Sequence, residues 1–286
     1  MISTNQIITK ARRSTNTSDI NSVSLLLCQD YLNRIQSAIE DNLYLVNDEN
    51  DLFIKDYNFN LIIGQDAYDL PDDIYAKSSI DTLAVSFLNG ISQTFLPLKK
   101  VSRKQRGFTF GYFVEQNKMI LTPRPASPLA MKLSYQQKIP DLAIRGGKIT
   151  DVTSTEITID EYVDGFEAES DYICVVDALG NIIKQGLVFS FDGSAIFTVS
   201  DTTGVQAGHY VVSGKRATTH SWLPKECEKI LITALERMIA YRQSSPDFNT
   251  SSILSKDELE TIKEVFADNS YDDAKPPVTE WQEWLP

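Results

Sequence analysis

Apolar residues recur every three or four positions in the first long patterned stretch of the chain, and this spacing predicts a helix over about residues 20–46. The stripe along one face of this helix consists of Cys28, Leu32, Ile35, Ile39 and Leu43. The residues before position 20 are polar, and we expect them to form a mobile lead. The chain therefore begins its ordered part with a helix.

The same helical spacing returns near the C-terminus, over residues 224–242 and again over 255–267. Pro224 stands at a position typical of the first turn of a helix, with glutamates following it. Ser255 and Glu258 have the spacing of a capping box, which satisfies free backbone donors at a helix start. We expect these two helices to form a bundle with the N-terminal one.

Between the first helix and the C-terminal helices, two stretches have the short apolar runs and turn residues of β-structure. In residues 53–142 the strands that we predict are Asp81–Leu88, Gly111–Val114, Lys118–Leu121 and Ala130–Tyr135. Five prolines border these runs, at positions 97, 123, 125, 128 and 140. Because proline cannot donate to a sheet ladder, we place them in turns or at sheet edges.

The second β-rich stretch spans residues 146–216, and its short, evenly spaced strands favour a compact antiparallel barrel or small sandwich. Its predicted strands are Lys148–Val152, Glu156–Ile159, Tyr172–Val176, Ile182–Phe191, Ile196–Val199 and His209–Val212. The sequence thus predicts an α+β protein. Its core, residues 1–145 and 217–286, combines a helical bundle with a small β-sheet, and residues 146–216 form an inserted β-rich domain.

The charge of the chain restricts its function. The 286 residues carry a formal net charge of −12, and residues 146–216 alone hold eleven acidic and four basic side chains. Duplex-binding proteins rely on a basic excess that neutralises phosphates, so this balance opposes specific binding of duplex DNA. Neither a signal-peptide pattern nor an apolar run of membrane-spanning length is found, which predicts no membrane partner.

No group of residues has the spacing of a catalytic or metal-binding motif. The only histidines, His209 and His220, lack an accompanying Gly-x-Ser-x-Gly motif, and Gly208–Arg216 lacks the spacing and hydroxyl of a phosphate-binding loop. Adjacent acids such as Asp72 and Asp73 lie in polar stretches, where solvated side chains are expected. Asp48–Asp51 lacks the glycine and terminal glutamate of a calcium loop. We expect no enzyme activity, cofactor or metal.

The cysteines and the C-terminal tail are the other residues with distinctive chemistry. Cys28, Cys174 and Cys227 are far apart and lie in apolar surroundings, which predicts reduced thiols in the core. The acidic tail that follows Asp268 is too polar to fold alone. Its aromatic residues are therefore candidate anchors for another surface, and they are Tyr271, Trp281 and Trp284.

One basic cluster interrupts the acidic sequence, with no acid between Asp81 and Glu115. It contains Lys99, Lys100, Arg103, Lys104 and Arg106. We prefer the interpretation that this patch meets an acidic surface on another protein subunit. A solvated loop, or a groove for single-stranded DNA completed by the phenylalanines that follow, are the alternatives.

Several blocks of the sequence resemble the head-to-tail adaptor proteins of tailed phages, including those of podoviruses. The first is Gly64–Asp73 (GQDAYDLPDD), followed by Phe95–Leu98, the Tyr-rich run Gly111–Glu115, the hairpin Asn117–Leu142 and the helix Leu223–Arg242. These blocks fall within residues 20–142 and 217–245. The stretch 146–216 resembles an insertion seen in some of these adaptors.

The resemblance implies a structural virion protein of the neck, assembled in the host cytoplasm. Such an adaptor docks as a ring, usually of twelve copies, under the portal protein and extends the DNA channel toward the tail. The implied partners are the portal, copies of the same chain, tail or nozzle proteins, and genomic DNA that passes without specific binding.

The alternative is a receptor- or glycan-binding virion protein that acts through the β-rich segment 146–216. This function requires exposed aromatic residues on one face, and the candidates are Tyr162, Phe166 and Tyr172.

Overall fold

The computed structural model describes residues 2–15, 23–46, 53–76, 80–89, 92–105, 111–160, 170–244 and 253–267. The chain is a mixed α+β protein that divides into two compact units. One unit comprises Met1–Glu49 and Pro140–Pro286, and the other comprises Asn50–Ile139. We refer to them as the helix–barrel unit and the two-sheet unit, and describe each by itself.

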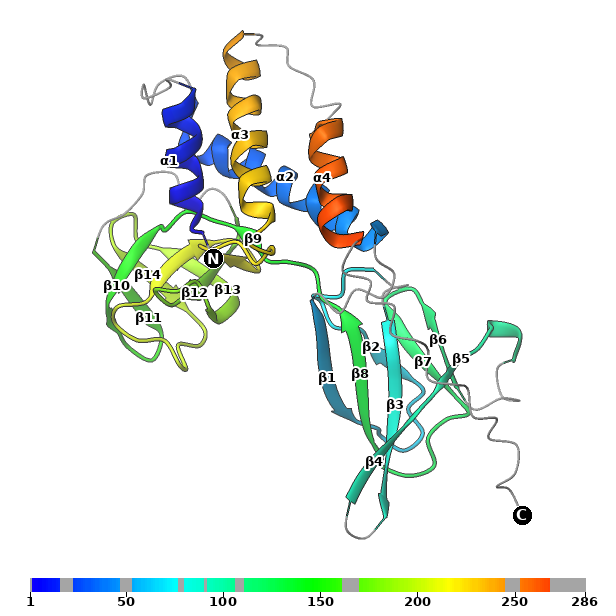
Figure 1. The fold of residues 1–286 in the computed structure, drawn as a ribbon. Helices are drawn as coiled ribbons and strands as arrows, with labels where there is room; N and C mark the ends of the chain where they lie inside the picture. Colours follow the sequence, from blue (N-terminus) through cyan, green and yellow to red (C-terminus); the bar gives the residue numbers. More distant parts are fainter. Residues whose placement is uncertain are drawn as a thin grey trace. The chain divides into compact units, whose positions relative to one another are not determined.

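Four helices are found among the described residues of the helix–barrel unit: α1 (Thr4–Ser14), α2 (Leu25–Val46), α3 (Cys227–Ser244) and α4 (Lys256–Ala267). α2 contacts each of the other three helices, and α1 also contacts α3 (Figure 1). The predicted stripe of α2 is confirmed, because Cys28, Leu32, Ile35, Ile39 and Leu43 are all buried. The arrangement of these helices as a bundle stays a prediction.

We expected the residues before position 20 to form a mobile lead. This expectation is wrong for Thr4–Ser14, which form α1. Ser3 caps this helix in a reciprocal capping box with Gln6. Its buried side chains lie at spacings of three, one and three along the chain, so they cover one helix face; they are Thr4, Ile7, Ile8 and Ala11. A short apolar face is enough here because α1 packs on α3.

Polar side chains of α2 hold the segment that leads into the barrel. Asn33 makes a reciprocal pair of hydrogen bonds with Leu142: its Nδ2 donates to the carbonyl at 3.0 Å, and its Oδ1 accepts from the amide at 2.7 Å. Gln36 Nε2 donates to the carbonyl of Pro140, and Gln29 Oε1 accepts from the amide of Ile144. These side chains satisfy backbone groups that a buried connection would otherwise leave unpaired.

The described strands of the segment 146–216 form a closed six-stranded barrel, the first of the two forms, barrel or small sandwich, that the strand spacing predicted. Its strands are β10 (Gly147–Val152), β11 (Glu156–Ile159), β12 (Tyr172–Val176), β13 (Ile182–Phe191), β14 (Ile196–Val199) and β15 (Tyr210–Ser213), in the order β10-β11-β14-β13-β12-β15. The core contains alternate residues of these strands, such as Ile149, Ile157, Ile173 and Phe197. Beside the barrel, the two-residue strands β9 (Asp141–Leu142) and β16 (Ala217–Thr218) pair in parallel. The boundary between a core and an inserted domain stays a prediction.

The described residues of the two-sheet unit form two four-stranded sheets, whereas we expected a single small sheet. The first has the order β1-β8-β3-β4, and the second has the order β2-β7-β6-β5. The strands are β1 (Ile54–Asn60), β2 (Ala67–Asp69), β3 (Ile80–Asn89), β4 (Ser92–Pro97), β5 (Lys99–Lys100), β6 (Gly111–Glu115), β7 (Lys118–Thr122) and β8 (Ala130–Gln136). Residues of both sheets form one core, for example Leu83, Leu133, Tyr112 and Leu121.

Pro97 lies in β4, an edge strand, as expected for a residue that cannot donate to a ladder. No helix in the described part of the chain is long and apolar enough to span a membrane.

Candidate functional site

The basic cluster of the sequence lies at the edge of the second sheet of the two-sheet unit. Lys99 and Lys100 form β5, which pairs in parallel with β6. The amide of Val101 donates to the carbonyl of Tyr112 at 2.8 Å, and the Val101 side chain is buried. Arg103–Gln105 then form a short 3-10 helix. The described part of the cluster, residues 99–105, is therefore a sheet edge followed by a helical turn.

Gly111 allows β5 to lie this close to β6. A Cβ atom at this position would lie 2.2 Å from the Lys99 carbonyl oxygen and 2.8 Å from Cγ1 of Val101. Both distances are far below van der Waals contact, and the nearer atom is backbone, which cannot rotate away. The absence of a side chain at Gly111 thus sets the position of the lysine-bearing strand.

The basic cluster presents a surplus of positive charge to solvent. Arg103 pairs with Glu115 at 3.0 Å, although its side chain is 74% exposed. Lys99, Lys100 and Lys104 are exposed, and none of them forms an ion pair with another described residue. We call these three lysines the basic edge. Arg106 lies outside the described residues.

The predicted anchors of the tail, Tyr271, Trp281 and Trp284, also lie outside the described residues, but the helix that precedes the tail is described. α4 begins with the capping box that the sequence predicted: Ser255 N donates to Glu258 Oε2 at 2.7 Å, and Glu258 N donates to Ser255 Oγ at 3.2 Å.

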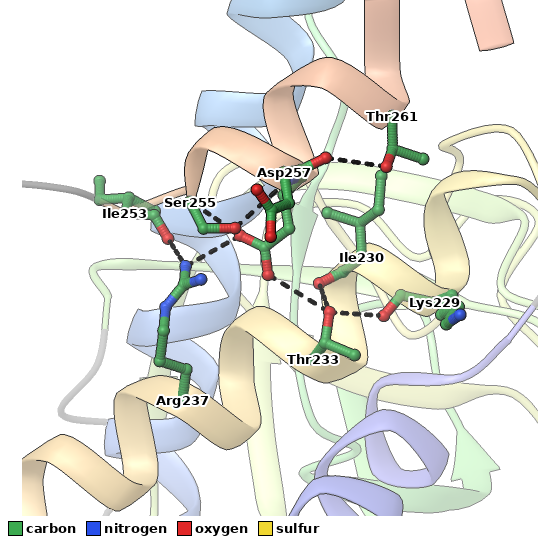
Figure 2. A network of polar contacts seen from close by, with 9 residues as sticks. Lys229, Ile230, Thr233, Arg237, Ile253, Ser255, Asp257 and Thr261 are labelled. Carbon is green, nitrogen blue, oxygen red and sulfur yellow. Dashed lines mark hydrogen bonds and ion pairs between the residues drawn. The ribbon is translucent and has the colours of Figure 1, made fainter. Parts of the chain in front are cut away.

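Glu258 also joins α4 to α3, and Figure 2 labels its partners Thr233, Arg237 and Ser255. Arg237 Nη2 lies 2.9 Å from Glu258 Oε2, and the same nitrogen donates to the carbonyl of Ile253 at 2.6 Å. Thr233 Oγ1 donates to Glu258 Oε1 at 3.3 Å. The Glu258 side chain is only 12% exposed.

The α3 residues that bind Glu258 were not identified from the sequence. Thr233 and Arg237 are four positions apart and therefore share one face of α3, which is the signal that could have shown them. α4 also contacts α2, and the apolar side chains of Leu254, Ile262 and Phe266 are buried. The chain consequently enters the tail from a helix that is fixed at both its start and its apolar face.

Asp73 has a structural role, whereas we expected a solvated side chain. Its carboxylate accepts hydrogen bonds from Tyr135 Oη at 2.6 Å, Lys55 Nζ at 2.7 Å and Gln137 Nε2 at 2.7 Å. Burial by itself would raise the pKa of Asp73, but these hydrogen bonds outweigh it and hold the pKa below its ordinary value. The carboxylate joins β8 to the segment after β2.

His220 lines a cavity of about 270 Å³ together with Ser3, Thr4, Arg145 and Thr219. No carboxylate is among the described residues that line it, and the ring contacts the side chain of Thr219, whose Oγ1 lies 3.0 Å from His220 Nδ1. Burial, followed by the positive charge of Arg145, lowers the pKa of His220. His209 does not line this cavity and lies just before β15.

The cysteines are buried as predicted, and desolvation raises the pKa of each thiol, to about 12 for Cys227. Within the described ranges, no group of three or more histidine, cysteine or acidic side chains could hold a metal ion. Asp48–Asp51, Tyr162 and Phe166 are not among the residues that the structure describes, and Tyr172 is half-buried in β12.

Comparison with known proteins identifies a family that this chain matches. A family model described as SU10 adaptor protein matches residues 3–166, more than half of the chain. The match includes α1, α2, the whole two-sheet unit and the first two barrel strands. A search of curated proteins finds no match.

Proposed function

Because the chain belongs to the SU10 adaptor protein family, a family of phage head-to-tail adaptors, we propose that it docks as a ring of twelve copies under the portal and extends the DNA channel toward the tail. The protein is a structural adaptor of a phage virion. The observation that carries the proposal is the family match over residues 3–166, which includes the two-sheet unit with its basic edge.

The charge of the chain supports passage of DNA through such a ring. A channel wall that neutralises phosphates would retain the genome, because each contact releases counterions and adds affinity. A net charge of −12 gives repulsion instead. In this proposal DNA slides past the adaptor without specific binding.

The basic edge is suited to a contact between subunits. Lys99, Lys100 and Lys104 are exposed and form no ion pair with another described residue, and they lie on a protein whose barrel segment, 146–216, has a large excess of acids. Complementary charge of this kind orients association and rejects wrong partners. In the ring, the basic edge faces an acidic surface of a neighbouring copy or of the portal.

The C-terminal tail extends this contact. Tyr271, Trp281 and Trp284 are aromatic residues in an acidic, proline-containing sequence, a composition typical of arms that order on a partner. The attachment of α4 through Glu258 and Arg237 gives such an arm a fixed starting point. We place the tail on the portal or on the adjacent copy.

Electron microscopy of the protein mixed with the portal of the same phage tests this function. We expect a symmetric additional ring beneath the portal. A chain that ends after Asp268 should bind the portal more weakly, and the complete chain purified in the same way is its control. Absence of a ring, with the complete chain left free, would refute the adaptor proposal; normal rings from the shortened chain would refute only the role of the tail.

A further inference from the structure

The first sheet of the two-sheet unit has two long open edges. β1 and β4 each have one neighbour among the described strands, β8 and β3 respectively. In the second sheet the edge strands are only two or three residues long, whereas β1 has seven residues and β4 has six. Open edges of this length are templates for pairing with another chain.

The hydrogen-bond pattern shows which groups of β1 face outward. Ladder bonds run from the amide of Leu61 to the carbonyl of Leu129 and from the amide of Gln137 to the carbonyl of Phe53. Because antiparallel pairs alternate along a strand, the odd-numbered residues of β1 bond to β8 and the even-numbered ones point to the open edge. These outward residues are Ile54, Asp56, Asn58 and Asn60.

The same reasoning applies to β4. The amide of Leu98 donates to the carbonyl of Leu83, so the even-numbered residues of β4 face β3. Gln93 and Phe95 therefore direct their amide and carbonyl groups outward. Pro97 also faces outward, where its missing N–H costs no bond within the sheet.

The β3–β4 hairpin extends beyond the rest of the sheet (Figure 1). β8 pairs with β3 only as far as Val85, while the pairing of β3 with β4 continues to Asn89 and Ser92. In this arm the two strands have no third strand from the described chain on either side. A two-stranded ribbon is marginally stable in water, so an arm of this kind gains stability from a partner strand.

Exposed apolar side chains lie on the same face at both edges. Tyr57 is opposite Leu133, whose side chain is in the core, and Leu96 pairs with Val85, which is opposite the core residue Met131. Tyr57 and Leu96 therefore share the core side of the sheet, yet they are 43% and 51% exposed. Joining the two edges would cover both side chains.

The charges of β1 do not block pairing. Unpaired charges on an edge strand usually prevent association. Here Lys55 is bonded to Asp73, and Asp56 is bonded to Lys132 at 2.7 Å and to Ser134 at 2.6 Å. These charges are compensated within the sheet.

Strand direction makes the two edges complementary. Each neighbouring pair in the order β1-β8-β3-β4 is antiparallel, so β1 and β4 run in opposite directions. When copies follow one another around an axis, β4 of one copy meets β1 of the next antiparallel. Such a head-to-tail contact uses two different surfaces, which is the kind of interface that closes into a ring.

We propose that β4 of one copy pairs with β1 of the next copy, so that the first sheets of neighbouring subunits form one continuous sheet around the ring. This inference rests on the ring formation proposed above. It names the partner, a second copy of this chain, and the strands that join.

The substitution Asn58→Pro tests the contribution of β1 to the proposed pairing of β4 with β1 of the next copy. The substitution Asn58→Pro removes an outward N–H and leaves the bonds to β8 intact, so circular dichroism and thermal melting should show a folded chain. We expect at least about a tenfold loss of adaptor bound in rings on the portal, because the proposed pairing loses a hydrogen bond and leaves an acceptor unpaired. The control Asn58→Ala keeps the N–H and should assemble within twofold of the wild type.

Phe95→Pro tests the β4 side in the same way, and a cryo-electron microscopy map of the wild-type ring tests the pairing without any substitution. We expect β4 and the neighbouring β1 to lie about 4.8 Å apart, the spacing of paired strands. Wild-type rings in which these strands are apart, or normal rings from folded Asn58→Pro protein, would refute the proposed strand pairing and leave the adaptor function in place. Absence of wild-type rings would overturn both.

Discussion

Asp73 shows how one side chain ties together residues that are distant in the sequence. Lys55 lies in β1, Tyr135 lies in β8 and Gln137 directly follows β8. Their hydrogen bonds to Asp73 lower the pKa of its carboxyl group. The sequence shows Asp72 and Asp73 as adjacent acids in a polar stretch, which is the usual pattern of solvated side chains. Only the pairing of strands reveals that one of the two is buried.

The lowered pKa of Asp73 makes a prediction about pH. Because the folded state favours the carboxylate, its contribution is complete above the pKa of the unfolded chain, near 3.9, and is lost as the pH falls through the lower pKa of the folded state. Asp73→Asn should reduce the free energy of unfolding at pH 7 by about 2 kcal/mol. The difference from the wild type should shrink below about pH 4 in urea denaturation series.

Asp69→Asn is the matched control for this prediction. The Asp69 side chain is 83% exposed and lies 3.4 Å from Lys118, so its loss should change stability by less than about 0.5 kcal/mol. A destabilisation by Asp73→Asn that stays constant down to pH 2 would contradict the assigned role of the carboxylate.

The spacing of apolar residues along the chain predicted the strands whose side chains enter a core. β12, β13 and β14 have the predicted bounds, since their alternating or continuous apolar residues enter the barrel core. β1 has no such pattern, because all but one of its side chains are exposed and the strand is defined by its neighbour β8. α1 could have been predicted, because Ser3 and Gln6 have the spacing of a capping box.

The attachment of α4 gives a prediction about a single helix. Glu258→Ala removes the bond that its side chain accepts from Ser255 N in the capping box, the pair with Arg237 and the bond from Thr233 together. We expect about 1–2 kcal/mol of destabilisation and faster amide hydrogen exchange confined to α4. Exchange followed by mass spectrometry measures it. Glu260→Ala is the control, because Glu260 is exposed on the same helix and should leave the exchange unchanged.

The whole molecule depends on pairings between distant segments, which periodicity does not determine. Residues 53–142 show short strands in sequence, but the division into two sheets comes from contacts such as β1 with β8, whose paired residues are 70 to 82 positions apart. The basic edge is an example. Its lysines were identified from the sequence, whereas the structure was needed to place Lys99 and Lys100 on a strand beside Gly111 and Lys104 in the 3-10 helix that follows.

Reversing the basic edge tests how whole subunits associate. In the proposed ring, Lys99, Lys100 and Lys104 face acidic groups, each pair contributing about 0.2–1 kcal/mol because the contact is solvent-exposed. Changing all three to Glu turns attraction into repulsion, so we expect roughly a tenfold or greater loss of adaptor on the portal. Sedimentation of the complex measures this loss, and wild-type binding should weaken as salt is raised.

The control for this experiment changes the same three lysines to Arg, which keeps the charge, and it should assemble as the wild type does. Arg103 is left in place in both variants, because its pair with Glu115 belongs to the fold of the edge. Normal assembly of the Glu variant, together with reduced retention of DNA in particles, would assign the basic edge to the genome. Normal assembly and normal retention would show that these lysines are only solvated, and the contact between copies would then rest on the strand edges and the tail.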